Sequence, residues 1–362
     1  SGVPVRALPI KILGDVLWAC IPGLGDAVEV DVEEGAPDKV WPLSAGLTTA
    51  TVRDLPYSYD MLVENFMDPG HVPFAHAGLQ GVRTDGSPIP MEVLARNDTT
   101  VEVSFEDVIR GKPRSGVVSF RSPCYYHFRV KDRETAAERL GLAILCVPVR
   151  PGVSRAIICA PRSPPKWFPT WLLHSLSNRF VDTDAWLHDA ERWCRGTQSH
   201  APMRGGGAGG GPAQGQDAAP TTLPAVGQSG LAGLNYAMPT SSDLGTRAFR
   251  QFWAQTGLAQ LPDFGPAPAG SLAWQPRMDQ FSRFHTHTAH CGICSRALRR
   301  AKLAARACPA LALVPIALGL PVVAQVIGVA AFLAAREAAR RVILALEGPV
   351  APGDLPPRAL ED

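Results

Sequence analysis

Two imidazoles, a carboxylate and a carboxamide lie together in the stretch Asn65-Phe-Met-Asp68-Pro-Gly-His71-Val-Pro-Phe-Ala-His76. Two neutral imidazoles and one carboxylate form the facial triad that holds Fe(II) in proteins and leaves coordination positions open for oxygen. His71 and His76 are five residues apart, which on a regular helix turns their side chains about 140° away from each other. The proline between them, Pro73, predicts a local distortion of the helix that lets both rings reach one metal ion.

Asp68 lies three residues before His71, a spacing that places both side chains on the same side of a helix. We therefore expect the Asp68 carboxylate to accept a hydrogen bond from the His71 ring and to fix its tautomer. The alternative is that the histidines are ordinary helix-surface residues behind an Asp-Pro turn. Their joint occurrence with Asn65 and Asp68 favours the metal site.

Composition indicates a protein with a substantial core and no nucleic-acid partner. Apolar residues make up 46% of the 362 residues, and 35 basic against 33 acidic side chains give a net charge of +2. Nucleic-acid-binding domains are instead strongly basic, with clustered Lys and Arg. The 8 cysteines are scattered, which is typical of thiols in a reducing compartment rather than of a secreted disulfide framework. The chain begins Ser-Gly-Val without a signal or transit peptide, so we expect its natural N-terminus to lie upstream.

The hydrophobic periodicity predicts a run of antiparallel strands together with several helices. Alternating apolar residues between turn signals predict strands over Ile10–Ile21, Val28–Val32, Val101–Arg110, Gly116–Ser122, Tyr125–Lys131, Leu142–Val149 and Ser154–Ala160. Apolar residues at helical spacing predict helices over Leu62–His76, Trp167–Trp193 and Arg247–Thr256. Together these elements indicate an α+β fold with an antiparallel sheet.

A long uncharged segment predicts a membrane anchor. The 29 residues between Arg306 and Arg336 carry no charge, which exceeds the roughly 20 apolar residues that cross a bilayer. Pro315 and Pro321 leave open a kinked span or a shallow re-entrant hairpin, and a buried core helix is the alternative. Basic residues precede the segment, which predicts that this side faces the cytosol or stroma. Upstream, the glycine-rich residues 201–222 are expected to be a disordered loop.

The motif Cys291-Gly-Ile-Cys294 has three interpretations. Close thiols have depressed pKa values and exchange readily, which favours a redox-active pair. The motif is also half of a zinc site, although the nearby histidines are crowded upstream rather than spaced as a second ligand pair. The third interpretation is a structurally inert pair. Four further histidines have no partner pattern and are expected to be packed or exposed: His127, His174, His188 and His200.

The chain resembles one known family in four segments: Glu64–Leu79, Asn178–Glu191, Ile10–Ile21 and Arg283–Leu298. The family is that of the pheophorbide a oxygenase and chlorophyllide a oxygenase-like Rieske non-haem iron oxygenases. Glu64–Leu79 resembles its iron-binding segment, and Asn178–Glu191 resembles the segment that brings the third iron ligand. Ile10–Ile21 resembles the strand after the Rieske domain, and Arg283–Leu298 resembles the Cys-x-x-Cys region ahead of a membrane anchor. The joint occurrence of these motifs selects this family.

The resemblance implies a role for each polar residue of the first motif. It makes His71 and His76 iron ligands and places Asn65 close to the iron. It makes Asp68 the carboxylate that passes electrons from the Rieske centre of a neighbouring subunit. A homotrimer is implied by the same transfer, because the electron donor lies on another copy of the chain.

The third iron ligand implied by the resemblance is Asp184. The residues after it are one short of the family's usual spacing, so Asp182 is the fallback. The alternative for both is a pair of helix N-caps before Ala185–Trp193, since aspartate is favoured there.

A Rieske cluster needs two cysteines and two histidines. Cys124-Tyr-Tyr-His127 has the spacing of the second half of the family's cluster motif, but no Cys-x-His precedes it, so we interpret it as coincidence. We therefore expect mononuclear Fe(II) in this chain, and a [2Fe-2S] cluster in the full-length protein with none of its ligands here.

The resemblance also implies the domain layout, with a helix-grip (START-like) catalytic domain followed by a membrane helix or hairpin. Residues 1–200 would form the first part of the iron domain, with 1–50 ending the region that links it to the Rieske domain. The loop at 201–222 would be followed by completion of the domain and the Cys-x-x-Cys segment at 223–300. A membrane anchor at 301–345 and a tail at 346–362 would complete the chain.

The implied function is oxidation of a chlorophyll-derived tetrapyrrole, such as pheophorbide a or chlorophyllide a, with O2 and electrons from ferredoxin. The implied location is a chloroplast membrane, inner envelope or thylakoid, with the catalytic domain facing the stroma and with thioredoxin-linked control through Cys291 and Cys294. One alternative is a non-catalytic tetrapyrrole-binding or redox-sensing component of the inner-envelope translocon. Another is an oxygenase for a different aromatic substrate.

Overall fold

The computed structural model describes residues 10–13, 16–19, 49–131, 138–160, 165, 167–196, 238–261, 264, 279 and 281–349. The strand predicted at 28–32 and the loop predicted at 201–222 lie outside these residues.

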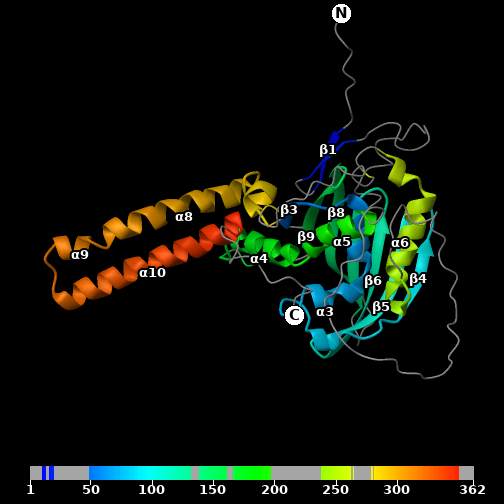
Figure 1. The fold of residues 1–362 in the computed structure, drawn as a ribbon, viewed down its shortest axis with the longest axis horizontal. Coiled ribbons are helices and arrows are strands. Elements are labelled where there is room, and N and C mark those ends of the chain that lie inside the picture. The colour runs from blue at the N-terminus through cyan, green and yellow to red at the C-terminus, as the bar shows by residue number, and fades with distance from the viewer. Residues whose placement is uncertain are drawn as a thin grey trace, which may run out of the picture.

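Seven antiparallel strands form one sheet in the order β3-β9-β8-β7-β6-β5-β4 (Figure 1). From β4 to β9 each strand pairs with the next, and β3 pairs with β9 at the far edge. The strands are β3 Thr49–Leu55, β4 Met91–Arg96, β5 Thr100–Ile109, β6 Lys112–Arg121, β7 Tyr125–Lys131, β8 Glu138–Arg150 and β9 Val153–Ala160. A separate hairpin pairs β1 (Ile10–Leu13) with β2 (Val16–Ala19).

The antiparallel sheet confirms the prediction. Among the strands that follow β3, only β4 was not predicted. This edge strand is mostly exposed, so its residues lack the apolar alternation by which a half-buried strand is predicted. In β5, by contrast, the alternate residues Val101, Val103 and Phe105 are buried.

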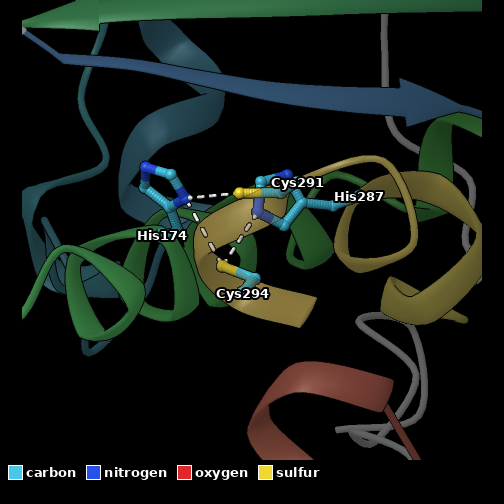
Figure 2. A group of neighbouring side chains, drawn as sticks. All are labelled: His174, His287, Cys291 and Cys294. Atoms are coloured by element: carbon cyan, nitrogen blue, oxygen red, sulfur yellow. Dashed lines mark hydrogen bonds between the residues drawn. The ribbon is translucent and has the colours of Figure 1, made fainter. Parts of the chain in front are cut away.

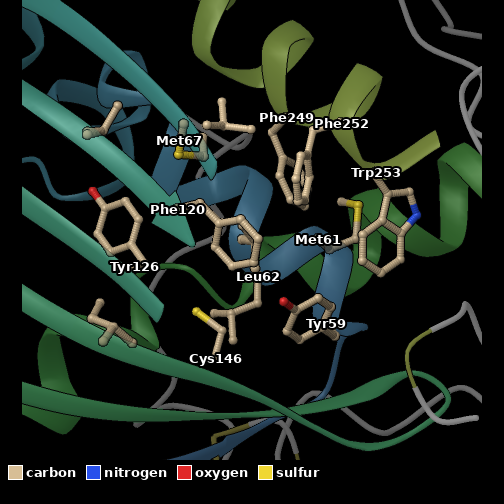
Figure 3. Packing of buried hydrophobic residues seen from close by; sticks show 14 of the residues in the cluster. Tyr59, Met61, Leu62, Met67, Phe120, Tyr126, Cys146, Phe249, Phe252 and Trp253 are labelled. Carbon is tan, nitrogen blue, oxygen red and sulfur yellow. The ribbon is translucent and has the colours of Figure 1, made fainter. Parts of the chain in front are cut away.

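Helices α2 (Tyr59–Met67) and α6 (Leu244–Gln255) pack with one face of the sheet to enclose the main core (Figure 3). Phe249 and Phe252 of α6 meet the ring of Phe120 on β6 edge-on, at centroid distances of 5.6 and 5.9 Å. Edge-on aromatic pairs of this kind add to the free energy gained by burying the rings. The core therefore fixes α2, which leads directly into the histidine motif.

The two helices approach closely at Gly245, in the first turn of α6. A Cβ atom at this position would lie 2.1 Å from the backbone carbonyl oxygen of Met67, the last residue of α2. Only glycine allows this approach, because any side chain would push α6 off the end of α2.

A buried ion pair also joins α6 to α2. Arg250 of α6 is 1% exposed and donates to the Asp60 carboxylate at 2.5 Å, and it contacts Glu64 one turn further along α2. A buried charge is tolerated only when an opposite charge compensates it.

The single helix predicted over Trp167–Trp193 is wrong, because two helices occupy this segment. They are α4 (Thr170–Asp182) and α5 (Trp186–Gly196). Between them the backbone N–H groups of Thr183 and Asp184 bond to carbonyls three residues back, which tightens the chain out of the α-helical path. Asp184 therefore lies in a turn between the helices.

The last helices form a long hairpin that projects from the sheet domain (Figure 1). The π-helix η5 (Phe284–Thr288) leads into α8 (Gly292–Leu311), and the short α9 (Val314–Ala317) connects α8 to α10 (Val322–Glu347). Among the described helices, α10 alone is long and apolar enough to cross a membrane. Only 6% of its apolar 18-residue stretch is buried inside the protein. A buried core helix therefore does not describe this segment.

Short helical turns complete the described chain: η1 Pro69–His71, α3 Val72–Ala75, η2 Arg83–Asp85, η3 Ser241–Asp243 and η4 Leu258–Gln260.

We expect Arg250→Leu to lower the free energy of unfolding by about 3–5 kcal/mol, because it leaves the buried Asp60 carboxylate without this cation. Urea denaturation followed by circular dichroism measures the change. Arg247→Leu, at a half-buried position of the same helix, is the matched control and should cost less than about 0.5 kcal/mol. Equal effects of the two substitutions would contradict the role given to the Arg250 pair.

Candidate metal centre

Three predicted ligand side chains converge in the structure although they come from two distant parts of the chain. His71 ends η1, His76 follows α3, and Asp184 lies in the turn between α4 and α5. The two Nε2 atoms are 3.1 Å apart, and His76 Nε2 is 3.6 Å from Asp184 Oδ1. All three donor atoms lie within 4.8 Å of one another, so one ion could contact all of them.

The local fold brings the two rings together by breaking the helix between them. Asp68 ends α2 and begins η1, and its carboxylate accepts a hydrogen bond from the Gly70 N–H at 2.8 Å. Pro73 then stands in the first turn of α3, where a proline needs no hydrogen-bond acceptor. The predicted distortion is confirmed, and it cancels the separation that a regular helix would impose on His71 and His76.

The hydrogen bonds of the two Nδ1 atoms determine the tautomers of the rings. The Thr183 hydroxyl donates to the carbonyl of Phe180 at 2.6 Å, so toward His76 Nδ1, also at 2.6 Å, it can only accept. His71 Nδ1 contacts the backbone carbonyl oxygen of Asp68, which is likewise an acceptor. In the neutral form of each ring, Nδ1 therefore carries the proton and Nε2 presents its lone pair.

The expected role of the Asp68 carboxylate in holding the His71 tautomer is wrong. The main-chain carbonyl of Asp68 makes that contact, while the carboxylate is used to cap η1. The reason is geometric, because the turn at Pro69 directs the Asp68 side chain toward Gly70.

Two lone pairs that face each other at 3.1 Å cannot form a hydrogen bond, and they repel unless a cation lies between them. Two nitrogens bound at right angles to one ion, each at about 2.1 Å, would be separated by roughly 3 Å. Asp184 Oδ1 adds a third donor, because it is buried and has no hydrogen-bond partner among the described residues. The donor set and its geometry thus fit a divalent metal such as iron.

Burial controls the protonation of these groups. Burial, with a smaller effect of His71, lowers the pKa of His76 to about 3, so its ring is neutral at pH 7. Burial raises the pKa of Asp184 to about 6, and His71 and the neighbouring carboxamide of Asn65 oppose that rise. Phe180 stacks on the His76 ring at a centroid distance of 3.8 Å and holds its orientation.

The fallback ligand Asp182 has other partners. One of its carboxylate oxygens accepts a hydrogen bond from Arg53 at 2.7 Å, and the other accepts one from Arg283 at 2.7 Å. These two arginines neutralise Asp182 and leave Asp184 as the carboxylate beside the histidine pair.

The remaining predicted site residues lie at two places. Asp68 is half-buried beside the centre, and burial raises the pKa of its carboxyl group. Cys291 and Cys294 lie elsewhere, at the base of the hairpin, where His174 and His287 contact them (Figure 2). Hydrogen bonding to Cys294 lowers the pKa of Cys291, burial opposes this, and the two imidazoles add to the lowering.

Sequence reasoning did not find Thr183 or His174. Thr183 stands between the two candidate aspartates, so the sequence Asp182-Thr-Asp184 contained a signal for it: a hydroxyl beside a predicted ligand. His174 was expected to have no functional partner, and its contact with the cysteine pair corrects that expectation.

Comparisons with known proteins find a family model and several curated proteins that are similar to parts of this chain. The family model described as Pheophorbide a oxygenase matches residues 120–198, a range that includes Thr183 and Asp184. Flavonoid 8-hydroxylase 2, chloroplastic, from Ocimum basilicum is 27% identical over 276 residues, 70% of this chain and 46% of the relative. Pheophorbide a oxygenase, chloroplastic, from Arabidopsis thaliana is 30% identical over 154 residues, 38% of this chain and 28% of the relative.

Among solved structures, dicamba monooxygenase bound to 3,6-dichlorosalicylic acid aligns with 55% of this chain and 65% of its own, at 13% identity and a TM-score of 0.36. This likeness is too slight to support an argument. The chain spans about half the length, 46%, of the first curated relative. The family model and the curated relatives indicate the class of Rieske-type oxygenases. Within that class, the family model and the curated relatives support the pheophorbide a oxygenase-like family, as the sequence resemblance predicted.

We expect Thr183→Val to weaken Fe(II) binding roughly 10–100-fold, because the His76 Nδ1–H loses its acceptor and the ring its fixed orientation. Anaerobic Fe(II) titration measures the affinity. Thr183→Ser keeps the hydroxyl and should bind Fe(II) as the wild type does. Wild-type affinity in Thr183→Val would show that the hydroxyl does not orient the ligand.

Proposed function

We propose that this chain is the mononuclear-iron catalytic part of a Rieske-type oxygenase that oxidises a chlorophyll-derived tetrapyrrole with O2 and ferredoxin-derived electrons. The observation that carries the proposal is the pair of Nε2 atoms, 3.1 Å apart, beside the buried Asp184 oxygen. Two imidazoles and one carboxylate are the donor set of non-haem Fe(II) oxygenases. Bound iron would supply the open coordination positions at which dioxygen is activated.

The chain's own residues would hold and orient this ion. His71, His76 and Asp184 would supply three donors to it, a number that leaves coordination positions free for oxygen. Thr183 and the Asp68 carbonyl keep the Nδ1 protons in place, so that each Nε2 lone pair points at the ion. Asn65, buried beside Asp184, would hold that carboxylate in its binding orientation.

Asp68 would connect the iron to the electron donor. Its backbone carbonyl contacts the ring of His71, so one hydrogen bond links this residue to an iron ligand. Its half-buried carboxylate would face the neighbouring subunit that supplies the electron. Electron entry at this position would require a Rieske centre on another copy, which is why a homotrimer belongs to the proposal.

Two substrate classes have support among the relatives. The match to Pheophorbide a oxygenase, at 30% identity, favours a chlorophyll-derived tetrapyrrole. The match to a flavonoid 8-hydroxylase covers more of the chain, at 27% identity, and favours a smaller planar aromatic as the second candidate. A helix-grip architecture is part of the proposal, since α2 and α6 cover one face of the antiparallel sheet.

The hairpin of α8 and α10 supports a chloroplast membrane location, together with the chloroplastic relatives. Its turn carries exposed apolar side chains, such as Leu318 at 69% and Val322 at 73% exposure. The uncharged part of α10, residues 322–335, is about 21 Å long, which is less than the roughly 30 Å hydrocarbon core. We therefore propose that the hairpin enters one leaflet and returns, so that α8 begins and α10 ends on the stromal side.

Nitric oxide, a stand-in for dioxygen at Fe(II), tests the iron centre. We expect the Fe(II)-loaded chain to give the S = 3/2 electron paramagnetic resonance signal of a non-haem iron–nitrosyl. The double variant His71→Ala/His76→Ala and the single variant Asp184→Ala should each lose at least about 90% of this signal, since the facial donor set is incomplete. His285→Ala removes an exposed histidine outside the centre and should keep the signal.

The same signal reports the substrate class. Pheophorbide a should perturb it if a tetrapyrrole binds beside the iron, and a flavone should perturb it if the second candidate is correct. A wild-type chain that folds but gives no more signal than His71→Ala/His76→Ala would overturn the catalytic proposal. A non-catalytic tetrapyrrole-binding or redox-sensing role would then replace it.

We expect Val322→Glu/Val326→Glu to release the protein from vesicles, because each change would place a charge in hydrocarbon at a cost of about 2.5–3.5 kcal/mol. Flotation with vesicles of chloroplast galactolipids measures the bound fraction. Leu303→Glu is the matched control, since Leu303 is 69% exposed but lies in the charged part of α8. Release by the control alone would place the membrane contact at the base of the hairpin instead.

A further inference from the structure

We propose that His174, His287, Cys291 and Cys294 bind a structural zinc ion that fastens the base of the hairpin to the sheet domain. Figure 2 shows the four side chains directed toward one another. This site is separate from the iron centre and shares no residue with it. It does not depend on the proposed oxygenase activity.

The four donors come from three elements. His174 lies on α4 and His287 on the π-helix η5, while Cys291 caps α8 and Cys294 stands in its first turn. The spacing of three residues places both sulfurs on one side of the α8 N-terminus. The π-helix directs His287 back toward them, and α4 supplies the fourth donor from more than 100 residues away in the sequence.

The distances between donors match one tetrahedral zinc ion. Cys294 Sγ is 3.3 Å from His287 Nε2 and 3.4 Å from His174 Nδ1, and Cys291 Sγ is 3.5 Å from His174 Nδ1. A tetrahedron with Zn–S bonds of about 2.3 Å and Zn–N bonds of about 2.0–2.1 Å has sulfur–nitrogen edges of roughly 3.6 Å. All four donor atoms lie within 4.8 Å of one another.

The tautomer of His287 is the one that a metal ligand requires. Its Nδ1 lies 2.6 Å from the backbone carbonyl of Val52 on β3, and a carbonyl can only accept. The proton is therefore on Nδ1, and the Nε2 lone pair faces Cys294. Ligating histidines commonly donate their other ring N–H to a backbone carbonyl in this way, which here also ties the site to the edge of the sheet.

Burial and donor type indicate a closed structural site. Cys294 is 0% exposed, His174 and His287 are 4% exposed, and Cys291 is half-buried. Four protein donors leave no position for substrate, as in structural zinc sites. A Rieske-type cluster does not fit, because its cysteines and histidines bind different irons, so no sulfur–nitrogen pair would form the edge of a single tetrahedron.

The surroundings show what the ion would hold together. Thr288, next to His287, donates to the carbonyl of Leu346 at 2.6 Å, near the end of α10. Leu346 packs with Cys294 and Leu298, so the end of α10 lies directly on the cysteine pair. A zinc ion here would join α4, η5 and α8 at the point where both arms of the hairpin meet the domain.

Metal analysis of the whole chain in detergent tests the proposal. The background variant His71→Ala/His76→Ala removes the iron centre, so that bound metal reports the cysteine site alone. We expect this background to keep roughly one zinc ion per chain under reducing conditions. Adding Cys294→Ser or His174→Ala should lower the zinc content at least about tenfold. Cys308→Ser, a buried cysteine of α8 outside the cluster, and His290→Ala, an exposed neighbour, should leave it unchanged.

Cobalt gives a second readout that does not rely on substitutions at the site. Co²⁺ added to the metal-free background chain should produce the thiolate-to-cobalt charge-transfer absorption of a tetrahedral site with two sulfurs. One molar equivalent of Zn²⁺ should remove it. Absence of both zinc and this absorption in a folded, reduced chain would overturn the proposal, as would zinc content unaffected by Cys294→Ser. A reversible Cys291–Cys294 disulfide in a chain without zinc would instead support the redox-active pair.

Discussion

The facing lone pairs of His71 and His76 are the constraint on which the rest of the centre depends. The Nδ1–H group of each ring donates to an oxygen that can only accept. Neither ring can therefore turn this N–H group toward the other ring. The broken helix, the turn between α4 and α5 and the stacking of Phe180 all hold the two rings in this arrangement. An arrangement in which these lone pairs converge is suited to a metal ion.

Much of the sheet and the pairing of His71 with His76 could be predicted from local patterns, whereas Asp184 was predicted only through the family resemblance. Strand periodicity located β5 to β9, and the prolines around His71 indicated the distorted helix. Local sequence patterns did not predict the structure where long-range contacts determine it. The break between α4 and α5 depends on the tertiary environment of Thr183 and Asp184, because the apolar periodicity continues through it. His174 meets Cys291 across 117 positions, a contact that no spacing rule could reveal.

Helix α4 connects the two candidate metal sites. His174 lies in its first half beside the cysteine pair, and the turn with Asp184 follows its last residue, Asp182. Between the sites, Asp182 is held by Arg53 of β3 and by Arg283, which also donates to the backbone of α10 at Ala345. The hairpin and the candidate metal centre are therefore linked by one helix and one network of charges.

The contacts of α10 with the domain have a consequence for the order of synthesis. The sheet and the histidine motif are synthesised long before Leu346 and Gly348. Both of these residues pack tightly on the domain: Leu346 is fully buried, and a Cβ at Gly348 would lie 2.2 Å from the carbonyl oxygen of Phe281. The base of the domain thus stays unfinished until the second arm of the hairpin has been made and folded back.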